Sequence, residues 1–373
     1  MYKGFAKFIR GKAFSILFLI VSFLSVGYTT VRIGAVLECC FAVKVYGVLF
    51  GIFLLLFGYM LLYHTSKRKI KKTRSFYELC SVVLSFLLNL VLCLLAEDFI
   101  GMFIGMFIHF SDSKVYILAI IVSVLLTVYG FLHANHIYIK HYAIPLEDRK
   151  NPVKVAFLSD IHTGTFVNKR QLRKIIDQTN RMQCDYVLIA GDTFDVDAFD
   201  YCNLSEIAEE LQRLKAVKGV YAILGNHDPV STDARMREFF QKSKIRLLVD
   251  EIIETEDFII IGRDDINSNP KRKALTEIVQ KICSDKPKIL MDHNPVGIAD
   301  GIQNNIDLVV CGHTHKGQFF PANLFTKWSY GKQGFYGYSK TNKTHSIVSS
   351  GAGYFQMPIR IGTNSEIVQI DIT

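Results

Sequence analysis

Two histidines stand two positions apart where an apolar run of the sequence ends. The run Leu308–Cys311 leads directly into Gly312-His313-Thr314-His315. Side chains at positions i and i+2 of an extended chain leave it on the same side, so both imidazoles can reach one site. Imidazole nitrogens are common ligands of transition metals, and this spacing is compatible with a metal site at the end of a strand.

Four further apolar runs lead into donors of the same kind. They precede, in order, Asp160 with His162, Asp192, the triplet Asn226-His227-Asp228, and His293. In α/β sheets, ligands bind beyond the carboxyl ends of the strands, where loops converge. Each pattern alone has an ordinary explanation, such as a turn or a hydrogen-bonded structural histidine. The five patterns together, each at a strand end, indicate one metal centre.

The segments between these runs have the periodicity of amphipathic helices. Helices are expected at Lys169–Gln183, Ser205–Ala216, Thr232–Ser243 and Ala274–Cys283. Short β-branched runs that alternate with such helices indicate an α/β domain, which we place at residues 150–373.

Residues 1–140 have the composition of a membrane domain. A helix needs about 20 apolar residues to cross a bilayer, so we expect about four transmembrane helices. The uncharged runs are Ala13–Val31, Val45–Tyr63, Leu79–Ala96 and Val115–Ala134. Residues 97–113 either extend the third span or lie in the interface. A cleaved signal peptide is the alternative for the first run, but no small-x-small cleavage site follows it.

The charges are divided unevenly between these two parts. Residues 1–140 hold 14 Lys/Arg and 5 Asp/Glu, a net charge of +9, whereas residues 141–373 hold 29 of each. Basic residues cluster at the N-terminus, in 64–77 and in 140–154, which places these segments and the α/β domain on the cytoplasmic side of the plasma (inner) membrane. A neutral α/β domain argues against nucleic acid as a partner.

The eight cysteines form no CxxC pair. We expect them to be free thiols in a reducing compartment.

The order of the motifs resembles the calcineurin-like metallophosphoesterase family over residues 150–373. That order is Asp-x-His, Gly-Asp, Gly-Asn-His-Asp, His and Gly-His-x-His. The spans and the C-terminal "IRIGTNSEIVQIDI" resemble the membrane-anchored bacterial branch, which includes UDP-diacylglucosamine pyrophosphatases. The resemblance implies a four-layer fold, in which two β-sheets are flanked by helices, and a two-metal site.

The resemblance also implies roles for individual residues. One ion would be held by Asp160, His162 and His315, the other by Asn226, His293 and His313, with Asp192 between them. His227 matches the family's catalytic histidine and Asp228 the residue that orients it. Asp195 either holds a ligand histidine or caps a turn. Lys316 replaces a glycine of many relatives, and either contacts a substrate phosphate or points into solvent.

This ligand set predicts two divalent ions, with Mn²⁺ favoured over Fe or Zn²⁺. The expected function is hydrolysis of phosphoester or pyrophosphate bonds at the membrane, with a metal-bridging hydroxide as nucleophile and His227 as general acid. Two alternatives stay open. One is a non-enzymatic membrane receptor or scaffold, and the other is a phosphodiesterase acting on a soluble nucleotide or nucleic acid.

Residues 319–338 are rich in aromatic side chains and include the only tryptophan, Trp328. They favour a lipid-linked substrate, or else form a satellite hydrophobic cluster. A linker from Asn135 to about Lys150 would hold the domain within roughly 55 Å of the bilayer.

Overall fold

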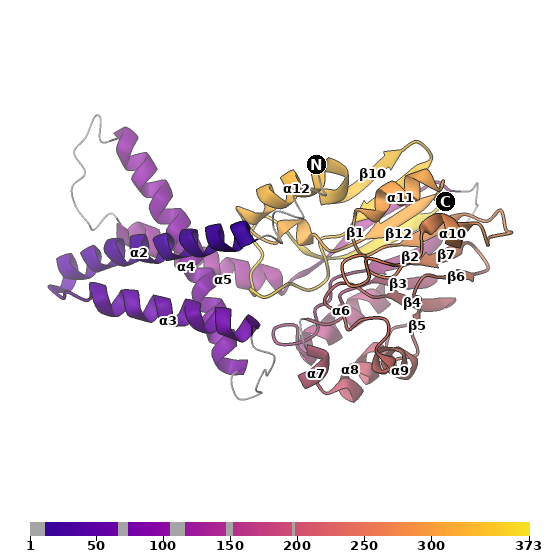
Figure 1. Ribbon diagram of the computed structural model, residues 1–373, viewed down its shortest axis with the longest axis horizontal. Helices are drawn as coiled ribbons and strands as arrows, with labels where there is room; N and C mark the ends of the chain where they lie inside the picture. Colours follow the sequence, from indigo (N-terminus) through magenta and orange to yellow (C-terminus); the bar gives the residue numbers. More distant parts are fainter. Residues whose placement is uncertain (1–11, 66–73, 105–115, 147–151, 196–197) are drawn as a thin grey trace. The chain divides into compact units, whose positions relative to one another are not determined.

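The computed structural model describes residues 12–65, 74–104, 116–146, 152–195 and 198–373 (Figure 1). The chain divides into two compact units. One comprises Met1–Leu132 with Gln356–Ile359, and the other comprises His133–Phe355 with Arg360–Thr373. The basic clusters before residue 12 and within 66–73 lie outside the described residues, as do 105–113 and 147–151.

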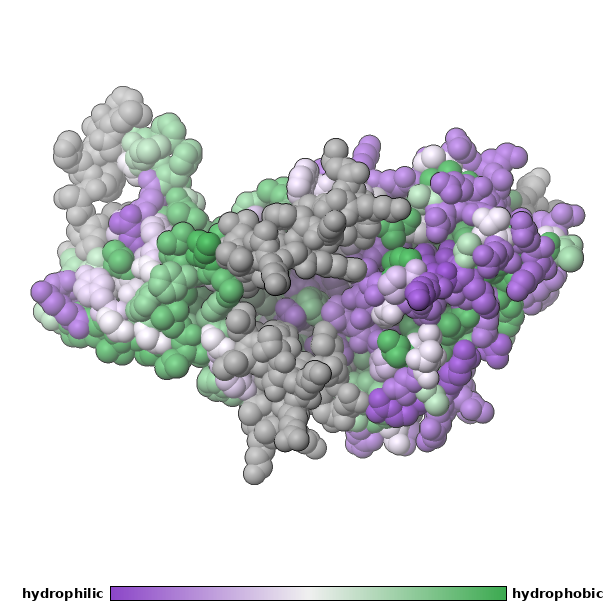
Figure 2. Space-filling view, in the orientation of Figure 1, coloured by the Kyte–Doolittle hydropathy of each residue, from purple (hydrophilic) through white to green (hydrophobic). Residues whose placement is uncertain are grey.

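The first unit consists of long apolar helices, as the four uncharged runs predicted. They are α2 (Lys12–Phe41), α3 (Tyr46–Thr65), α4 (Arg74–Ile104) and α5 (Tyr116–Ala134). Within the described residues, three stretches are long and apolar enough to cross a membrane, namely Leu19–Phe41, Phe76–Phe103 and Tyr116–Ala134, and a shorter one spans Tyr46–Tyr59. Because α4 continues to Ile104, residues 97–104 extend the third helix. Figure 2 shows hydrophobic residues over much of these helices and hydrophilic residues over much of the other unit.

An ion pair ties helices of the first unit together. Arg32 Nη2 of α2 lies 2.6 Å from Asp98 Oδ2 of α4. Tyr28 donates a hydrogen bond to the same carboxylate, and Tyr116 of α5 lies within hydrogen-bond distance of both charged groups. Charged groups within apolar helices are costly unless they are paired in this way.

The second unit is built on two six-stranded sheets. The first has the order β1 (Ile137–Ile144), β12 (Ser365–Ile372), β2 (Val153–Leu158), β3 (Tyr186–Ala190), β4 (Gly219–Ile223) and β5 (Arg246–Leu247). The second has the order β10 (Gly337–Thr341), β11 (Thr344–Val348), β9 (Leu308–Cys311), β8 (Lys288–Met291), β7 (Ile259–Gly262) and β6 (Glu251–Glu254). Neighbours from β2 to β5 are parallel, and so are those from β7 through β8 and β9 to β11. The carboxyl ends of each parallel set therefore meet at one edge of their sheet.

The alternation of side chains along the strands explains the layers. In β2, Val155 and Phe157 pack between the sheets, whereas Ala156 and Leu158 face the helices outside the first sheet. Successive residues of a strand point to opposite faces, so a strand that is apolar throughout is buried on both sides.

Helices cover the outer face of each sheet. The first sheet is covered by α6 (Lys169–Arg181), α8 (Leu204–Leu211) and α9 (Ala234–Lys242), and the second by α10 (Leu275–Val279) and α11 (Gly297–Gln303). Asn168, Asn203 and Asp233 cap the first three, since each side chain accepts hydrogen bonds from the first turn. The four expected helices are present, each ending before its predicted last residue. The predicted fold of apolar helices followed by a two-sheet α/β domain is confirmed.

The expected linker after Asn135 is wrong for most of its described part. Ile137–Ile144 form β1, an edge strand that pairs in parallel with β12 in full register. Only two residues separate the end of α5 from the start of β1. All eight cysteines lie in the described part of the chain, and none of them forms a disulfide there.

Candidate metal centre

The proposed ligands follow the carboxyl ends of five parallel strands. Asp160 and His162 come after β2, Asp192 after β3, Asn226 after β4, His293 after β8, and His313 and His315 after β9. Apart from the half-exposed Asn226 and His313, these residues are buried. The folding of the two sheets thus collects side chains that are up to 155 positions apart in the sequence.

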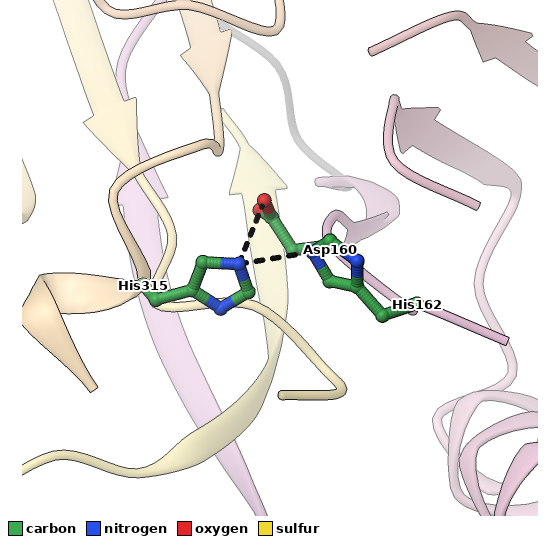
Figure 3. A group of neighbouring side chains, drawn as sticks. All are labelled: Asp160, His162 and His315. Carbon is green, nitrogen blue, oxygen red and sulfur yellow. Dashed lines mark hydrogen bonds and ion pairs between the residues drawn. The ribbon is translucent and has the colours of Figure 1, made fainter. Parts of the chain in front are cut away.

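Asp160, His162 and His315 form one cluster of donors (Figure 3). Nε2 of His162 and Nε2 of His315 are 3.0 Å apart, and the latter lies 3.5 Å from Asp160 Oδ1. Two nitrogens at this separation can both lie at a normal bond length of about 2.0–2.1 Å from one common point. The cluster therefore fits a transition-metal ion.

A second cluster consists of Asp192, His293 and His313. Nδ1 of His293 lies 2.8 Å from the carbonyl oxygen of Ala190, which directs its Nε2 toward the carboxylate of Asp192 at 3.1 Å. A hydrogen bond from the other ring nitrogen to a carbonyl is the usual way to orient a metal-binding histidine. The side-chain oxygen of Asn226 is buried and has no hydrogen-bond partner among the described residues, which suits a further ligand.

Asp192 is placed between the two clusters. Its Oδ2 lies 3.1 Å from Nε2 of His293 and 3.7 Å from Nε2 of His162. Its Oδ1 accepts the backbone N–H of His227 at 2.8 Å. One carboxylate thus contacts a member of each cluster and also holds the loop that carries His227.

Burial decides the charge of these groups. It lowers the pKa of His162 to about 3 and that of His315 well below the usual value, so both imidazoles are neutral and have a free lone pair. Burial also raises the pKa of Asp160 to about 6. Although burial opposes it, the charge of His293 lowers the pKa of Asp192 well below its usual value. His293 differs from the two neutral imidazoles, because the carboxylate of Asp192 raises its pKa well above the usual value although burial opposes this. A divalent cation bound beside Asp192 would take the place of that proton.

The backbone of the centre is strained at most of the proposed ligands. Asp160, His162, Asp192, His313 and His315 have φ values between 48° and 72°, in the left-handed region. Side chains other than glycine seldom occupy this region, and the cost is of order 1–3 kcal/mol per residue. Such a concentration of strain is typical of functional sites, because the surrounding fold has to maintain it.

Two glycines allow the close approach of neighbouring loops. A Cβ on Gly225 would lie 2.1 Å from Asp192 Oδ1, and one on Gly312 would lie 2.2 Å from Asp160 Oδ2. Only glycine leaves room for the carboxylates at these two positions.

His227 lies at the edge of the first cluster. The centroid of its ring is 5.2 Å from that of His162 and 4.7 Å from that of Phe355. The neighbouring Asp228 is buried, which raises its pKa to about 7, and its two oxygens accept the backbone N–H groups of Phe194 and Gly225 at 2.9 Å each. These hydrogen bonds join the loops after β3 and β4, so Asp228 positions the main chain that carries His227.

The two remaining candidates lie beside the centre. Oδ1 of Asp195 is 3.8 Å from Nδ1 of His162, on the side of the ring away from His315. Lys316 also has a left-handed backbone, with φ of 52°, a conformation that glycine adopts more readily than lysine. Its ammonium group lies 4.4 Å from the ring centroid of Tyr336.

One buried residue next to the centre was not singled out from the sequence. Arg360 is fully buried, and its guanidinium donates hydrogen bonds to the carbonyl oxygens of Ser350, Gly353 and His315. Its Nη2 also lies 3.4 Å from Nδ1 of His315. A single arginine in the apolar stretch before β12 was the available signal, because an arginine is rarely buried without several acceptors.

The two sheets bring two groups of possible metal ligands together at their strand ends, and this part of the chain is similar to known proteins. Residues 153–317 match the family model described as calcineurin-like phosphoesterase. This match agrees with the resemblance that the order of the motifs indicated for this part of the chain.

Several relatives share this domain. An uncharacterized metallophosphoesterase of Helicobacter pylori is 30% identical over 240 residues, covering 62% of this chain and 63% of its own. A transmembrane protein with metallophosphoesterase domain from Danio rerio is 30% identical over 277 residues, covering 68% and 62%. Phosphodiesterase YaeI of Escherichia coli is 28% identical over 190 residues, covering 48% and 67%.

The chain spans less than two thirds of the length of the first two of these relatives. Its three long apolar helices, together with a relative that is named a transmembrane protein, indicate a membrane protein.

Proposed function

We propose that this chain is a membrane-bound, metal-dependent hydrolase of phosphoester or pyrophosphate bonds. The observation that carries the proposal is the pair of buried donor clusters with Asp192 between them. Two divalent ions at such a site would supply Lewis acidity toward a phosphoryl oxygen and lower the pKa of a water molecule. The domain's family supports this reaction class.

The residues of the chain have separate tasks in this proposal. One ion would be held by Asp160, His162 and His315 and the other by Asn226, His293 and His313, and the carboxylate of Asp192 would be available to both. His227 lies beside the first cluster, where a histidine can give a proton to the leaving oxygen. Asp228 holds the loop of His227 through main-chain hydrogen bonds, and Asp195 and Arg360 hold His162 and His315 from behind.

The identity of the metal, the class of substrate and the location of the domain are further parts of this proposal. Four imidazoles and two carboxylates favour Mn²⁺, with Fe or Zn²⁺ as the alternatives. The apolar helices favour a lipid-linked substrate, in line with the resemblance to the membrane-anchored bacterial branch. The distribution of basic residues favours a cytoplasmic domain at the plasma (inner) membrane, and the neutral charge of residues 141–373 speaks against nucleic acid.

A phosphodiesterase that acts on a soluble nucleotide is the second candidate, supported by the name of the Escherichia coli relative. A non-enzymatic receptor or scaffold would be free to lose donors, whereas this chain retains the full set.

The deciding experiment is reconstitution of the purified full-length chain with Mn²⁺, Fe²⁺ or Zn²⁺, followed by assays on phosphomonoesters, phosphodiesters, and nucleotide-linked and lipid-linked diphosphates. The proposal expects metal-dependent hydrolysis of at least one class. Stoichiometric metal without turnover of any of them would favour the receptor.

A further inference from the structure

The segment that follows the metal-ligand loop forms a helix with its apolar side outward. This helix, α12 (Ala322–Phe335), is kinked at Gly331, whose φ is 67°, and appears in gold in Figure 1. Leu324, Phe325 and Trp328 are 58%, 40% and 63% exposed, and Phe320 just before the helix is 49% exposed. In a soluble domain, the apolar face of a helix normally packs on the core. The only buried residue of α12 is Gly334, so here the pattern is reversed.

The opposite side of α12 is joined to the candidate metal centre. The ring of Tyr330 lies 5.9 Å from that of His313, and the carbonyl oxygen of Phe335 accepts a hydrogen bond from Thr314 at 2.8 Å. Thr314 stands between the two histidines of the His-x-His motif. Tyr330 before the kink and Phe335 after it thus lie beside the His-x-His motif, whereas Leu324, Phe325 and Trp328 are exposed.

The start of the aromatic segment is also joined to the end of a candidate membrane span. Thr363 donates a hydrogen bond to the carbonyl oxygen of Gln318 at 2.6 Å, and its own carbonyl oxygen lies 3.1 Å from Nε2 of His133. His133 belongs to the last turn of α5. A single residue thus connects the segment that leads into α12 with the end of a helix long and apolar enough to cross a bilayer.

Two cations lie among the exposed positions of the helix. Lys327 and Lys332 are exposed, together with the three apolar side chains. Tryptophan and phenylalanine beside lysine are typical of surfaces that enter the headgroup layer of a membrane, where lysine meets anionic lipid.

We propose that the apolar face of α12, formed by Phe320, Leu324, Phe325 and Trp328, inserts into the interfacial layer of a bilayer that contains anionic lipid. The candidate metal centre then opens beside the membrane surface, behind Tyr330. That lipid-linked substrates would enter the centre along this face rests on the proposed function. The contact between α12 and the membrane does not rest on it.

The chain contains one tryptophan, so its fluorescence reports the position of Trp328 alone. The full-length protein is reconstituted in vesicles with and without anionic lipid, and is quenched either by lipids brominated on the acyl chain or by aqueous iodide. The expected result is a blue-shifted emission, strong quenching by brominated lipid and weak quenching by iodide, with a larger lipid effect in anionic vesicles. Hydrolysis is not measured, so failure of the proposed function would not affect this result.

Two variants sharpen the test. Leu324→Gln with Phe325→Gln is expected to shift quenching from the lipid to iodide. Lys327→Gln with Lys332→Gln is expected to remove the difference between anionic and neutral vesicles. Strong iodide quenching of the unmodified protein would overturn the proposal, because the face would then be in water. Protection from both quenchers would also overturn it, since a protein surface would then cover the face. Equal lipid quenching in both vesicle types would overturn the requirement for anionic lipid.

Discussion

The guanidinium of Arg272 holds the carboxylate of Asp292 with two parallel hydrogen bonds, at 3.0 and 2.7 Å. The side chains are 4% and 0% exposed, and Asp292 directly precedes the proposed ligand His293. A Cβ on Gly297 would lie 2.1 Å from this carboxylate, so α11 approaches it closely. The pair thus supports the strand end from which His293 enters the second donor cluster.

Removal of the arginine from this buried ion pair should lower the stability of the fold. We expect Arg272→Met to destabilise the protein by about 3–5 kcal/mol, because it leaves a buried carboxylate without its cation. Thermal unfolding of the full-length protein in detergent would measure the change. The double variant Arg272→Met with Asp292→Asn should recover part of the loss, since the uncompensated charge is then absent.

An exposed ion pair provides the control for Arg272. Arg235 pairs with Asp233 at 2.6 Å, but the arginine side chain is 57% exposed. Arg235→Met should therefore cost less than about 1 kcal/mol. If both arginine variants lowered the melting temperature equally, the buried pair would not support the strand end as described.

Two variants should distinguish the residue that donates a proton from a residue that binds metal. His227→Ala should keep its bound metal while hydrolysis falls by about 10²–10⁴-fold, the range for loss of a general acid. Asp192→Asn should lose metal and activity together, because its carboxylate contacts both clusters. Elemental analysis and turnover of a phosphodiester would be measured on the same preparations. Turnover by His227→Ala at the parent rate would remove the histidine from this role.

A methyl group at Gly225 should disturb the centre without removing any donor. The Cβ would lie 2.1 Å from Asp192 Oδ1 and 2.4 Å from the backbone nitrogen of the same residue. Real Cβ atoms do not tolerate such distances, so the loop of Asp192 has to move. We expect Gly225→Ala to lose most of its metal in elemental analysis. Gly51→Ala in α3 is the control, since a Cβ there would have no neighbour within 4 Å beyond the adjacent backbone of its own helix. Full metal content in Gly225→Ala would show that the loops are not packed this tightly.

The proposed ligands could be found in the sequence because each of them is a local signal. A short apolar run followed at once by Asp, His or Asn marks a strand end, and parallel strands bring such ends together. The strand β1 gave no such signal. Its residues Ile137–Ile144 are mostly exposed, and its partner β12 lies more than 220 positions further along the chain, so a linker was the simpler interpretation.

Side chains buried by distant contacts were equally hidden from a sequence analysis. The acceptors of Arg360 are carbonyl oxygens of loops, which leave no mark on residue types. The orientation of α12 was hidden for a related reason. An aromatic helix with its apolar face inward and one with that face outward have the same composition, and only the packing of Gly334 and Tyr330 distinguishes them.

The loss of folding stability at acidic pH should depend on Glu210 of α8. The hydrogen bonds and charges of Arg173 and Arg213 lower the pKa of this carboxyl from 4.5 to about 2. A lowered pKa in the folded state means that the ionised form stabilises the fold. This contribution is fully present above about pH 4.5 and is lost as the pH falls toward 2. Glu210→Gln should therefore have a lower melting temperature than the parent at neutral pH, and the difference should shrink between about pH 4.5 and 2. Glu209→Gln, on the exposed side of the same helix, is the matched control. A difference between Glu210→Gln and the parent that stayed constant down to the lowest pH would mean that the two arginines stabilise α8 by packing instead of by charge.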